Sequence, residues 1–354
     1  MIAIHVDDLL MGGSQCFHDE VLKPLKEKFP FKHWHTRGGE FLGKHVQQHE
    51  DGRITISQKE YSMSVSCLNV GKERRKQKDS FVTEQEKTQM RALLGEVNWI
   101  AMNSRPDLAA SCSLLQQKTS NAKVEDLIEC NRLASLVRDF AHGCVTIHPI
   151  PPSELEFAVW SDASWANATD KKSQGGYLIM AASCELRKGN WSLTSPLRWK
   201  SYRQDRQVAS TLGAELLPAS RAIAECKWVR SRCEAVFGAN SIESDKVFSP
   251  RIPLCVLIDS KPVFDHCNSE VVTIKDKRLA IEMLLMKKEF QKEGLFLRWQ
   301  PTYAMLGDVL TKSNAPKELI RNMVMNGKFK ISEDATIRNW AAKTTRTKKL
   351  NDEM

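Results

Sequence analysis

The alternation of apolar and polar residues near the start of the chain predicts two β-hairpins. In IAIHVDDLLM, residues 2–11, aliphatic and β-branched residues lie on both sides of two adjacent aspartates, which predicts strand, turn and strand. The two acids would then occupy the tip of the hairpin. Residues 38–58 predict a second hairpin, because Asp51–Gly52 separates two runs of alternating character.

Helical periodicity dominates the next part of the chain. Apolar residues recur at helical spacing from Met90 to Ile100, and residues 104–107 end this helix and begin another. A further helix is predicted from Val124 to the neighbourhood of Gly143. Such apolar stripes are typical of core packing, so we assign them no chemistry.

Residues 148–154, HPIPPSE, mark a boundary, because closely spaced prolines do not fit inside a regular element. The pattern beyond the boundary predicts three successive strands, a long helix, a buried strand, a second helix and a last strand. Their residue ranges are 155–164, 175–183 and 190–201 for the strands, 214–237 for the helix, and then 253–260, 274–293 and 295–302. This order predicts a mixed sheet flanked by helices, and therefore a mixed α/β (α+β) fold class.

Composition narrows the functional classes. With 354 residues, of which 42% are apolar, the chain is expected to be globular, and its net charge of +9 favours a polyanionic partner. The ten cysteines form no Cys-x-x-Cys pair, which predicts reduced thiols in an intracellular protein, either cytoplasmic or nuclear. No apolar run reaches the roughly 18 residues of a membrane span, so we expect a soluble protein without a membrane partner.

Four acidic residues in the second half occupy positions that favour chemistry. Asp162 and Asp259 stand at the ends of predicted strands, Glu215 opens a predicted helix, and Asp308 follows the last strand. Carboxylates that converge on one edge of a sheet repel one another unless cations lie between them, and two Mg²⁺ ions about 4 Å apart are the usual occupants. Each acid alone is more often a helix cap or a solvated group, so the prediction depends on the set.

Several sequence blocks, in a fixed order, resemble copia-type (Pseudoviridae-like) retrotransposon polyproteins over residues 1–315. In the first half the blocks are IHVDDLL, GEFLGKHV, GRITISQKEY and LLGEVNWIAMNSRPDL. In the second half they are SDASWA, KKSQGGY, RWKSYRQDRQVASTLGAEL, LIDS and GDVLTKS. The resemblance implies the C-terminal part of a reverse transcriptase followed by a ribonuclease H domain.

The resemblance also implies roles for individual residues. Asp7 and Asp8 match the adjacent metal-binding aspartates of the polymerase palm, and Phe41, Leu42 and Gly43 fall near its primer grip. The ribonuclease H carboxylates, which hold two Mg²⁺ or alternatively Mn²⁺ ions, match a second set: Asp162, Glu215, Asp259 and Asp308. These four are expected to cluster within a few ångströms of shared cation positions, because both ions must contact one scissile phosphate.

Some features depart from the family pattern. The third palm aspartate of the family would lie upstream of the first hairpin, so polymerase activity is expected to be lost or to depend on a missing upstream part of the polyprotein. His5 replaces the usual aromatic residue of the hairpin. Pro218 follows Glu215 closely and is expected to kink the helix that presents this acid, although proline is tolerated in a first helical turn.

The expected domains are a palm remnant at 1–60, a helical thumb or connection region at 61–147, a ribonuclease H-like domain at 153–315 and a polar tail at 316–354. A basic run at residues 72–78, which includes Arg74, Arg75 and Lys76, is expected either to follow a phosphate backbone or to be a solvated loop. Four tryptophans in the ribonuclease H-like domain are candidates for base stacking, although core positions are commoner: Trp160, Trp165, Trp191 and Trp199.

The function predicted from these observations is metal-dependent hydrolysis of RNA in RNA–DNA hybrids, with hybrid or template–primer as the nucleic-acid partner. One alternative is a catalytically inactive retroelement remnant that only binds nucleic acid through its basic surface. Another is a reading frame whose product does not accumulate. Intact carboxylates favour the enzyme, whereas the incomplete palm favours a remnant.

Overall fold

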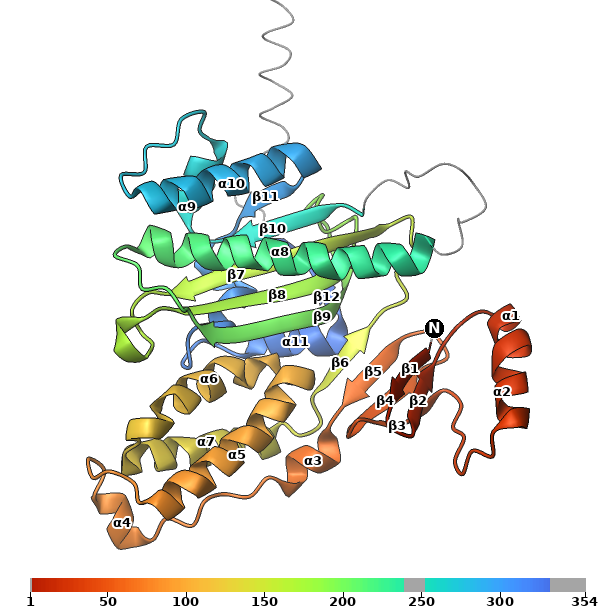
Figure 1. Cartoon of the computed structure of the whole chain (residues 1–354), viewed down its shortest axis with the longest axis horizontal. Helices are drawn as coiled ribbons and strands as arrows, with labels where there is room; N and C mark the ends of the chain where they lie inside the picture. Colours follow the sequence, from red (N-terminus) through yellow and green to blue (C-terminus); the bar gives the residue numbers. More distant parts are fainter. Residues whose placement is uncertain (1, 239–251, 332–354) are drawn as a thin grey trace, which may run out of the picture.

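Three β-sheets and their connecting helices make up the computed structural model, which describes residues 2–238 and 252–331 (Figure 1). A two-stranded hairpin and a four-stranded sheet are built from residues before 148, and a six-stranded sheet from residues after 154. The predicted mixed α/β fold class is confirmed. The predicted division into four domains stays a prediction.

The first hairpin has the predicted form. Strand β1 (Ile2–His5) pairs antiparallel with β2 (Asp8–Met11), and Val6 and Asp7 form the connecting turn. A short helical segment follows, made of α1 (Gln15–Phe17), η1 (His18–Leu22) and α2 (Lys23–Lys28).

The four-stranded sheet combines two distant parts of the chain. Its strands, in spatial order, are β3 (Gly38–Phe41), β4 (Lys44–Gln48), β5 (Ile54–Ser57) and β6 (Cys144–Ile147). The predicted Asp51–Gly52 turn joins β4 to β5, with Gly52 at a φ of 83° that favours glycine. Strand β6 was not predicted. It pairs with β5 and so joins the end of the helical region to this sheet.

The helical region between β5 and β6 packs around its own apolar core. Its elements are α3 (Lys59–Ser64), α4 (Lys72–Lys76), α5 (Glu84–Asn103), η2 (Pro106–Leu108), α6 (Ala109–Lys118), η3 (Thr119–Asn121) and α7 (Val124–Asp139). A capping box of Thr83 and Glu86 fixes the start of α5. Met90 and Val97 on the predicted stripe are fully buried, as expected for core residues.

The six-stranded sheet is mixed, as predicted. Its strands are β7 (Leu155–Ser164), β8 (Gln174–Ser183), β9 (Ser192–Arg203), β10 (Leu254–Ile258), β11 (Phe296–Trp299) and β12 (Lys328–Phe329). In space they are ordered β11-β10-β7-β8-β9-β12. Strands β10 and β11 are parallel to β7, whereas β8 is antiparallel to both of its neighbours, so the carboxyl ends of β7 and β10 meet at one edge.

Helices cover both faces of this sheet (Figure 1). The connecting elements are η4 (Thr169–Lys171), α8 (Thr211–Gly238), α9 (Lys261–Asn268), α10 (Lys277–Glu293), η6 (Thr302–Ala304), η7 (Leu306–Leu310) and α11 (Glu318–Asn326). Neighbouring residues of β7 point to opposite faces, so Val159 packs with the α8–α10 layer and Trp160 packs with the layer that contains η7 and α11.

The segment after residue 315, expected to be a polar tail, begins with ordered structure. Ile320, Met323 and Val324 of α11 are buried at helical spacing, and Phe329 of β12 is buried against the same core. The prediction of a tail for residues 316–331 was therefore wrong. This segment is polar on average, but its few apolar residues lie on one face of a helix and pack on the sheet. Residues 332–354 lie outside the described residues.

Candidate metal centre

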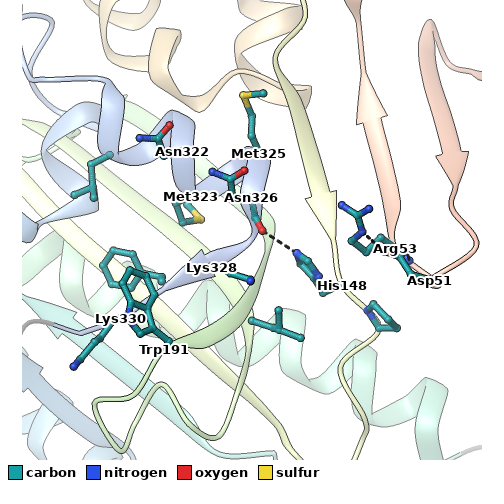
Figure 2. Close-up of a pocket in the computed structure, with 14 residues that line it drawn as sticks. Asp51, Arg53, His148, Trp191, Asn322, Met323, Met325, Asn326, Lys328 and Lys330 are labelled. Carbon is teal, nitrogen blue, oxygen red and sulfur yellow. Dashed lines mark hydrogen bonds and ion pairs between the residues drawn. The ribbon is translucent and has the colours of Figure 1, made fainter.

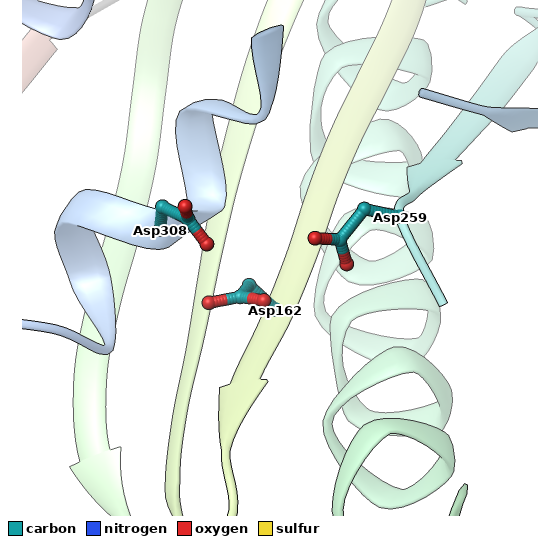
Figure 3. Close-up of side chains that lie close together, drawn as sticks. All are labelled: Asp162, Asp259 and Asp308. Carbon is teal, nitrogen blue, oxygen red and sulfur yellow. The ribbon is translucent and has the colours of Figure 1, made fainter. Parts of the chain in front are cut away.

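Three of the predicted acids meet at one edge of the six-stranded sheet. Asp162 near the end of β7, Asp259 just after β10 and Asp308 in η7 each offer a carboxylate oxygen, and these oxygens lie within 4.8 Å of one another (Figure 3). The parallel pairing of β7 with β10 places the first two side by side. Residues up to 146 positions apart in the sequence (308 − 162) are thereby joined in one cluster.

A glycine lets η7 approach Asp162 closely. A Cβ atom on Gly307 would lie 2.7 Å from the Cβ of Asp162, closer than side-chain carbons approach one another. Gly176, opposite Asp162 on β8, leaves room in the same way for the Cβ of Leu310, which would be 2.6 Å away. Both glycines belong to blocks of the family resemblance, GDVLTKS and KKSQGGY. Their absent side chains allow the third carboxylate to join the first two.

Hydrogen bonds hold the three carboxylates in place. The Thr311 hydroxyl donates to Oδ2 of Asp162, and the Thr302 hydroxyl donates to Oδ2 of Asp259 at 3.1 Å. The Lys312 ammonium donates to Oδ1 of Asp308 at 2.5 Å and lies 4.0 Å from Oδ2 of Asp162. Lys312 therefore places one positive charge between two of the acids.

Glu215 lies beside this triad rather than within it. Its carboxylate faces the backbone of Ala163, the residue after Asp162. Burial, followed by the nearby charges of Asp162 and Asp259, raises the pKa of Glu215 well above its ordinary range. The fourth predicted acid is thus close enough to share the electrostatics of the cluster.

Helix α8, which carries Glu215, continues through Pro218. Proline lacks the N–H that would bond the carbonyl of Ala214, and the buried side chain of Gln204 donates to that carbonyl instead, at 2.9 Å. This bond gives the carbonyl of Ala214 a new partner. It explains how α8 accommodates a proline three residues after Glu215. The helix is continuous across Pro218, and the kink expected there stays a prediction.

Burial makes the triad costly without counter-charge. Asp162 is 1% exposed, and its pKa is raised strongly, first by burial and then by the charge of Asp259. The pKa of Asp259 is also raised, by burial and by Asp308. Hard carboxylate oxygens at this spacing fit Mg²⁺ or a similar divalent cation, which would offset the repulsion. The residues therefore fit a metal site.

The first pair of acids has a different setting. Asp7 and Asp8 are both exposed, and within residues 2–238 and 252–331 no third metal-binding side chain joins them in a cluster. Asp8 pairs with His5 across the hairpin. The structure places these two aspartates at the tip, as predicted, without assembling a site around them.

The other predicted nucleic-acid residues lie in two separate places, a hairpin turn and the short helix α4. Phe41 ends β3, and Leu42 and Gly43 form its tight turn to β4, with φ values of 53° and 63° that suit this hairpin type. In α4, Arg74 forms a two-point ion pair with Glu86 and Arg75 donates to the carbonyl of Val70.

Lys76 of the same basic run pairs with Glu73 at 2.7 Å. Arg74, Arg75 and Lys76 therefore all have partners inside the chain, and at least Arg74 stabilises the local fold. Their role in binding nucleic acid stays a prediction.

No family model matches the sequence, but curated proteins do. The chain is 25% identical over 238 residues to the putative transposon Ty5-1 protein of Saccharomyces cerevisiae, an alignment that covers 63% of this chain and 73% of the yeast protein. It is 22% identical over 326 residues to the retrovirus-related Pol polyprotein from transposon RE2 of Arabidopsis thaliana, covering 87% of this chain. The chain is a distant homologue of copia-type Pol polyproteins.

The chain spans 20% of the length of the RE2 polyprotein, and the same share of its RE1 counterpart. Two solved structures are partly similar to it. The LC11 ribonuclease H1 isolated from compost is 14% identical, with a TM-score of 0.29, over 48% of this chain and 96% of that enzyme. The foamy viral protease–reverse transcriptase in complex with an RNA/DNA hybrid is 12% identical, with a TM-score of 0.42, over 89% and 37%.

Three residues of the site were not predicted. Thr302, Thr311 and Lys312 contact the acids directly, and the last two lie in the block GDVLTKS. The four-residue spacing from Asp308 to Lys312 was an available signal, because such pairs meet within one helical turn.

Among the described residues, no helix combines the length and apolar character needed to cross a membrane.

Proposed function

We propose that the chain is a ribonuclease H-type hydrolase that cuts the RNA strand of RNA–DNA hybrids. The observation that carries this proposal is the convergence of Asp162, Asp259 and Asp308 at one sheet edge, with Glu215 beside them. Two Mg²⁺ ions bound there would activate water and stabilise the leaving oxygen of a phosphodiester. The family resemblance and the basic net charge of +9 support a polyanionic substrate.

The chain's own groups would prepare this reaction. Asp162, Asp259 and Asp308 would bind the cations, and Glu215 would hold the second ion or its water from α8. Thr311 and Thr302 orient two of the carboxylates through hydrogen bonds. Lys312 partly neutralises the cluster and is suitably placed to attract an incoming phosphate.

Nucleotide incorporation at Asp7 and Asp8 is not part of the proposal for this chain alone. A palm needs a further carboxylate to hold two ions, and the described residues bring none to this hairpin. Binding of hybrid or template–primer by Phe41, Leu42 and Gly43 would position the substrate. An intracellular location, cytoplasmic or nuclear, fits the free state of all ten cysteines.

Cleavage of an end-labelled RNA–DNA hybrid tests the proposal. The purified chain should cut RNA in Mg²⁺ and stop with chelator, and Asp259→Asn should reduce the rate by roughly a thousandfold or more. Hybrid affinity should change little, because phosphate contacts elsewhere supply most of the binding. Asp265→Asn is the matched control. Asp265 is an exposed aspartate that pairs with Lys261 within α9, the helix that follows Asp259.

A folded wild-type protein that binds hybrid tightly and never cuts in Mg²⁺ or Mn²⁺ would contradict the enzyme. That result would instead favour the alternative predicted from the sequence, a remnant that only binds nucleic acid. Equal cleavage by Asp259→Asn and Asp265→Asn would exclude the assigned site.

A further inference from the structure

A second candidate site lies at the opposite end of the six-stranded sheet. A cavity of about 980 Å³ is enclosed by the Asp51 turn, the start of β9, α11 and β12 (Figure 2). Leu193 of β9 lines the cavity, and its neighbour Thr194 pairs with Ala182 of β8, which in turn pairs with Glu156 of β7. The cavity therefore lies at the level of Glu156 along the sheet. Asp162 is farther along β7 by six residues (162 − 156), or about 20 Å. The cavity is therefore separate from the metal centre.

The wall of this cavity is tightly built around His148. Its Nε2 donates to the carbonyl oxygen of Asn326 at 3.2 Å, and its backbone N–H donates to the Ser195 hydroxyl at 2.8 Å. Gly327, which ends α11 at a φ of 59°, allows this contact, because a Cβ there would lie 2.1 Å from the His148 ring. The cavity thus has a defined shape at the junction of the two larger sheets.

Positive charge gathers in the cavity. Three basic side chains line it, Arg53, Lys328 and Lys330, against the single carboxylate of Asp51. Asp51 pairs with Arg53 at 2.5 Å. Burial lowers the pKa of His148, and the charges of Arg53 and Lys328 contribute in the same direction, so both cations lie close to the ring. The lining suits an anionic ligand.

Trp191 adds a large apolar surface beside these cations. Its side chain is 70% exposed, whereas Trp160 and Trp199 of the same sheet are 0% and 5% exposed and belong to the core. An exposed indole next to basic groups is the combination that binds single-stranded nucleic acid, because a base stacks on the ring while the cations contact phosphates. In a duplex the base faces are already stacked and do not reach such a ring.

We propose that this cavity binds a segment of single-stranded polynucleotide, with one base stacked on Trp191 and the adjoining phosphates beside Lys328 and Arg53. The proposal does not depend on hydrolysis at the metal centre. It gives the chain a place to hold an unpaired strand about 20 Å from the carboxylates, at the far end of β7.

Fluorescence anisotropy with short labelled oligothymidylate and oligouridylate tests the proposal on the whole chain. Chelator is present, so that the acidic cluster has no cations with which to attract phosphate. Trp191→Ala should weaken binding roughly tenfold, and Trp228→Ala, which removes another half-exposed tryptophan, should leave it unchanged. Lys328→Gln should weaken binding by about two- to threefold and lower the salt dependence by about one counterion. The two probes show whether DNA or RNA is preferred.

Photocrosslinking locates the bound strand. An oligouridylate containing 5-iodouridine should crosslink to the peptide that contains Trp191. Crosslinks confined to other peptides, or equal affinities of the Trp191→Ala and Trp228→Ala proteins, would overturn the proposal. Uridine monophosphate that competes as well as the oligonucleotide would also overturn it, because the site would then take a single nucleotide rather than a strand.

Discussion

Two groups of aspartates in this chain carry the same chemical group in opposite settings. Asp7 and Asp8 are neighbours in sequence, and they lie exposed at the tip of a hairpin. Asp162, Asp259 and Asp308 are far apart in sequence and are brought together by strand pairing and by η7. The adjacent pair is the more conspicuous in the sequence, yet the distant group is the one that the described structure assembles into a cluster.

The difference between the two groups is one of dielectric environment. Two charges 4 Å apart interact by about 1 kcal/mol in water and by about 4 kcal/mol at the effective dielectric typical of a protein. The repulsion within the exposed pair is therefore small. The triad, in which Asp162 is buried and the other two acids are half-buried, needs a proton, Lys312 or bound cations, and this need is what makes it a candidate metal site.

The largest expected effect is on the pH dependence of the metal-free protein. The pKa of Asp162 is raised by folding, so the folded state keeps a proton that the unfolded state releases above a pH of about 4. Stability is complete below that pH and falls as pH rises, by about 1.4 kcal/mol per pH unit for each retained proton. Thermal unfolding in chelator should show the fall for the wild type and a shallower one for Asp162→Asn.

The same scans separate the two groups of acids. Asp7→Asn should follow the wild type at every pH. Added Mg²⁺ should restore wild-type stability near neutral pH and do little for Asp162→Asn. A wild-type protein whose stability rises between pH 5 and pH 8 in chelator would contradict the buried-charge account.

A smaller effect is expected from Lys312. Lys312→Met removes the internal cation from Asp308 and should lower the stability of the metal-free protein by about 1 kcal/mol, a modest value because its side chain is 35% exposed. Bound Mg²⁺ should recover that loss. Lys261→Met breaks an exposed pair of the same four-residue spacing and should cost less, with no response to Mg²⁺. Identical behaviour of the two variants would show that Lys312 is not part of the site.

The Gln204 bond to α8 is expected to contribute a similar amount. Gln204→Leu should cost about 1 kcal/mol, because the carbonyl of Ala214 then stays buried without a partner. In a Pro218→Ala background the cost should shrink, since the new N–H can bond Ala214 itself. Urea unfolding of the four proteins measures this coupling as a double-mutant cycle. Additive costs would mean that the Gln204 bond does not compensate for proline.

The smallest effect belongs to the exposed hairpin. The double variant Asp7→Asn/Asp8→Asn should change the free energy of unfolding by less than about 0.5 kcal/mol, as for other surface substitutions. It should leave hybrid cleavage unchanged. A clear loss of stability on removing these two charges would show that the hairpin tip is held by contacts that an exposed turn does not predict.

Much of the fold follows from local patterns. The mainly apolar run in residues 155–164 and the helical stripe from Met90 to Ile100 specify their own elements, because a strand covered on both faces and a helix covered on one face each have a characteristic spacing of apolar residues. Strand β6 and helix α11 were missed for the opposite reason. Each is short, and each is stabilised by residues that are distant in the sequence, β6 by pairing with β5 and α11 by packing on the core that contains Trp160.

The site shows the same limit. Each of the predicted acids could be found because family blocks and strand ends mark them, but their partners could not. Thr311 contacts Asp162 across 149 positions, and Gln204 acts on Glu215 only through a carbonyl that Pro218 leaves free. The first of these contacts depends on the close approach of η7 to Asp162 that Gly307 permits, which no local pattern encodes.

Titration with Mn²⁺, followed by calorimetry, tests most directly whether burial rather than adjacency makes the metal site. The wild type and Asp7→Asn/Asp8→Asn should bind the ion with the same stoichiometry and affinity. Asp162→Asn/Asp259→Asn should lose that binding while keeping a folded spectrum. Binding that survives in Asp162→Asn/Asp259→Asn and disappears in Asp7→Asn/Asp8→Asn would contradict the account.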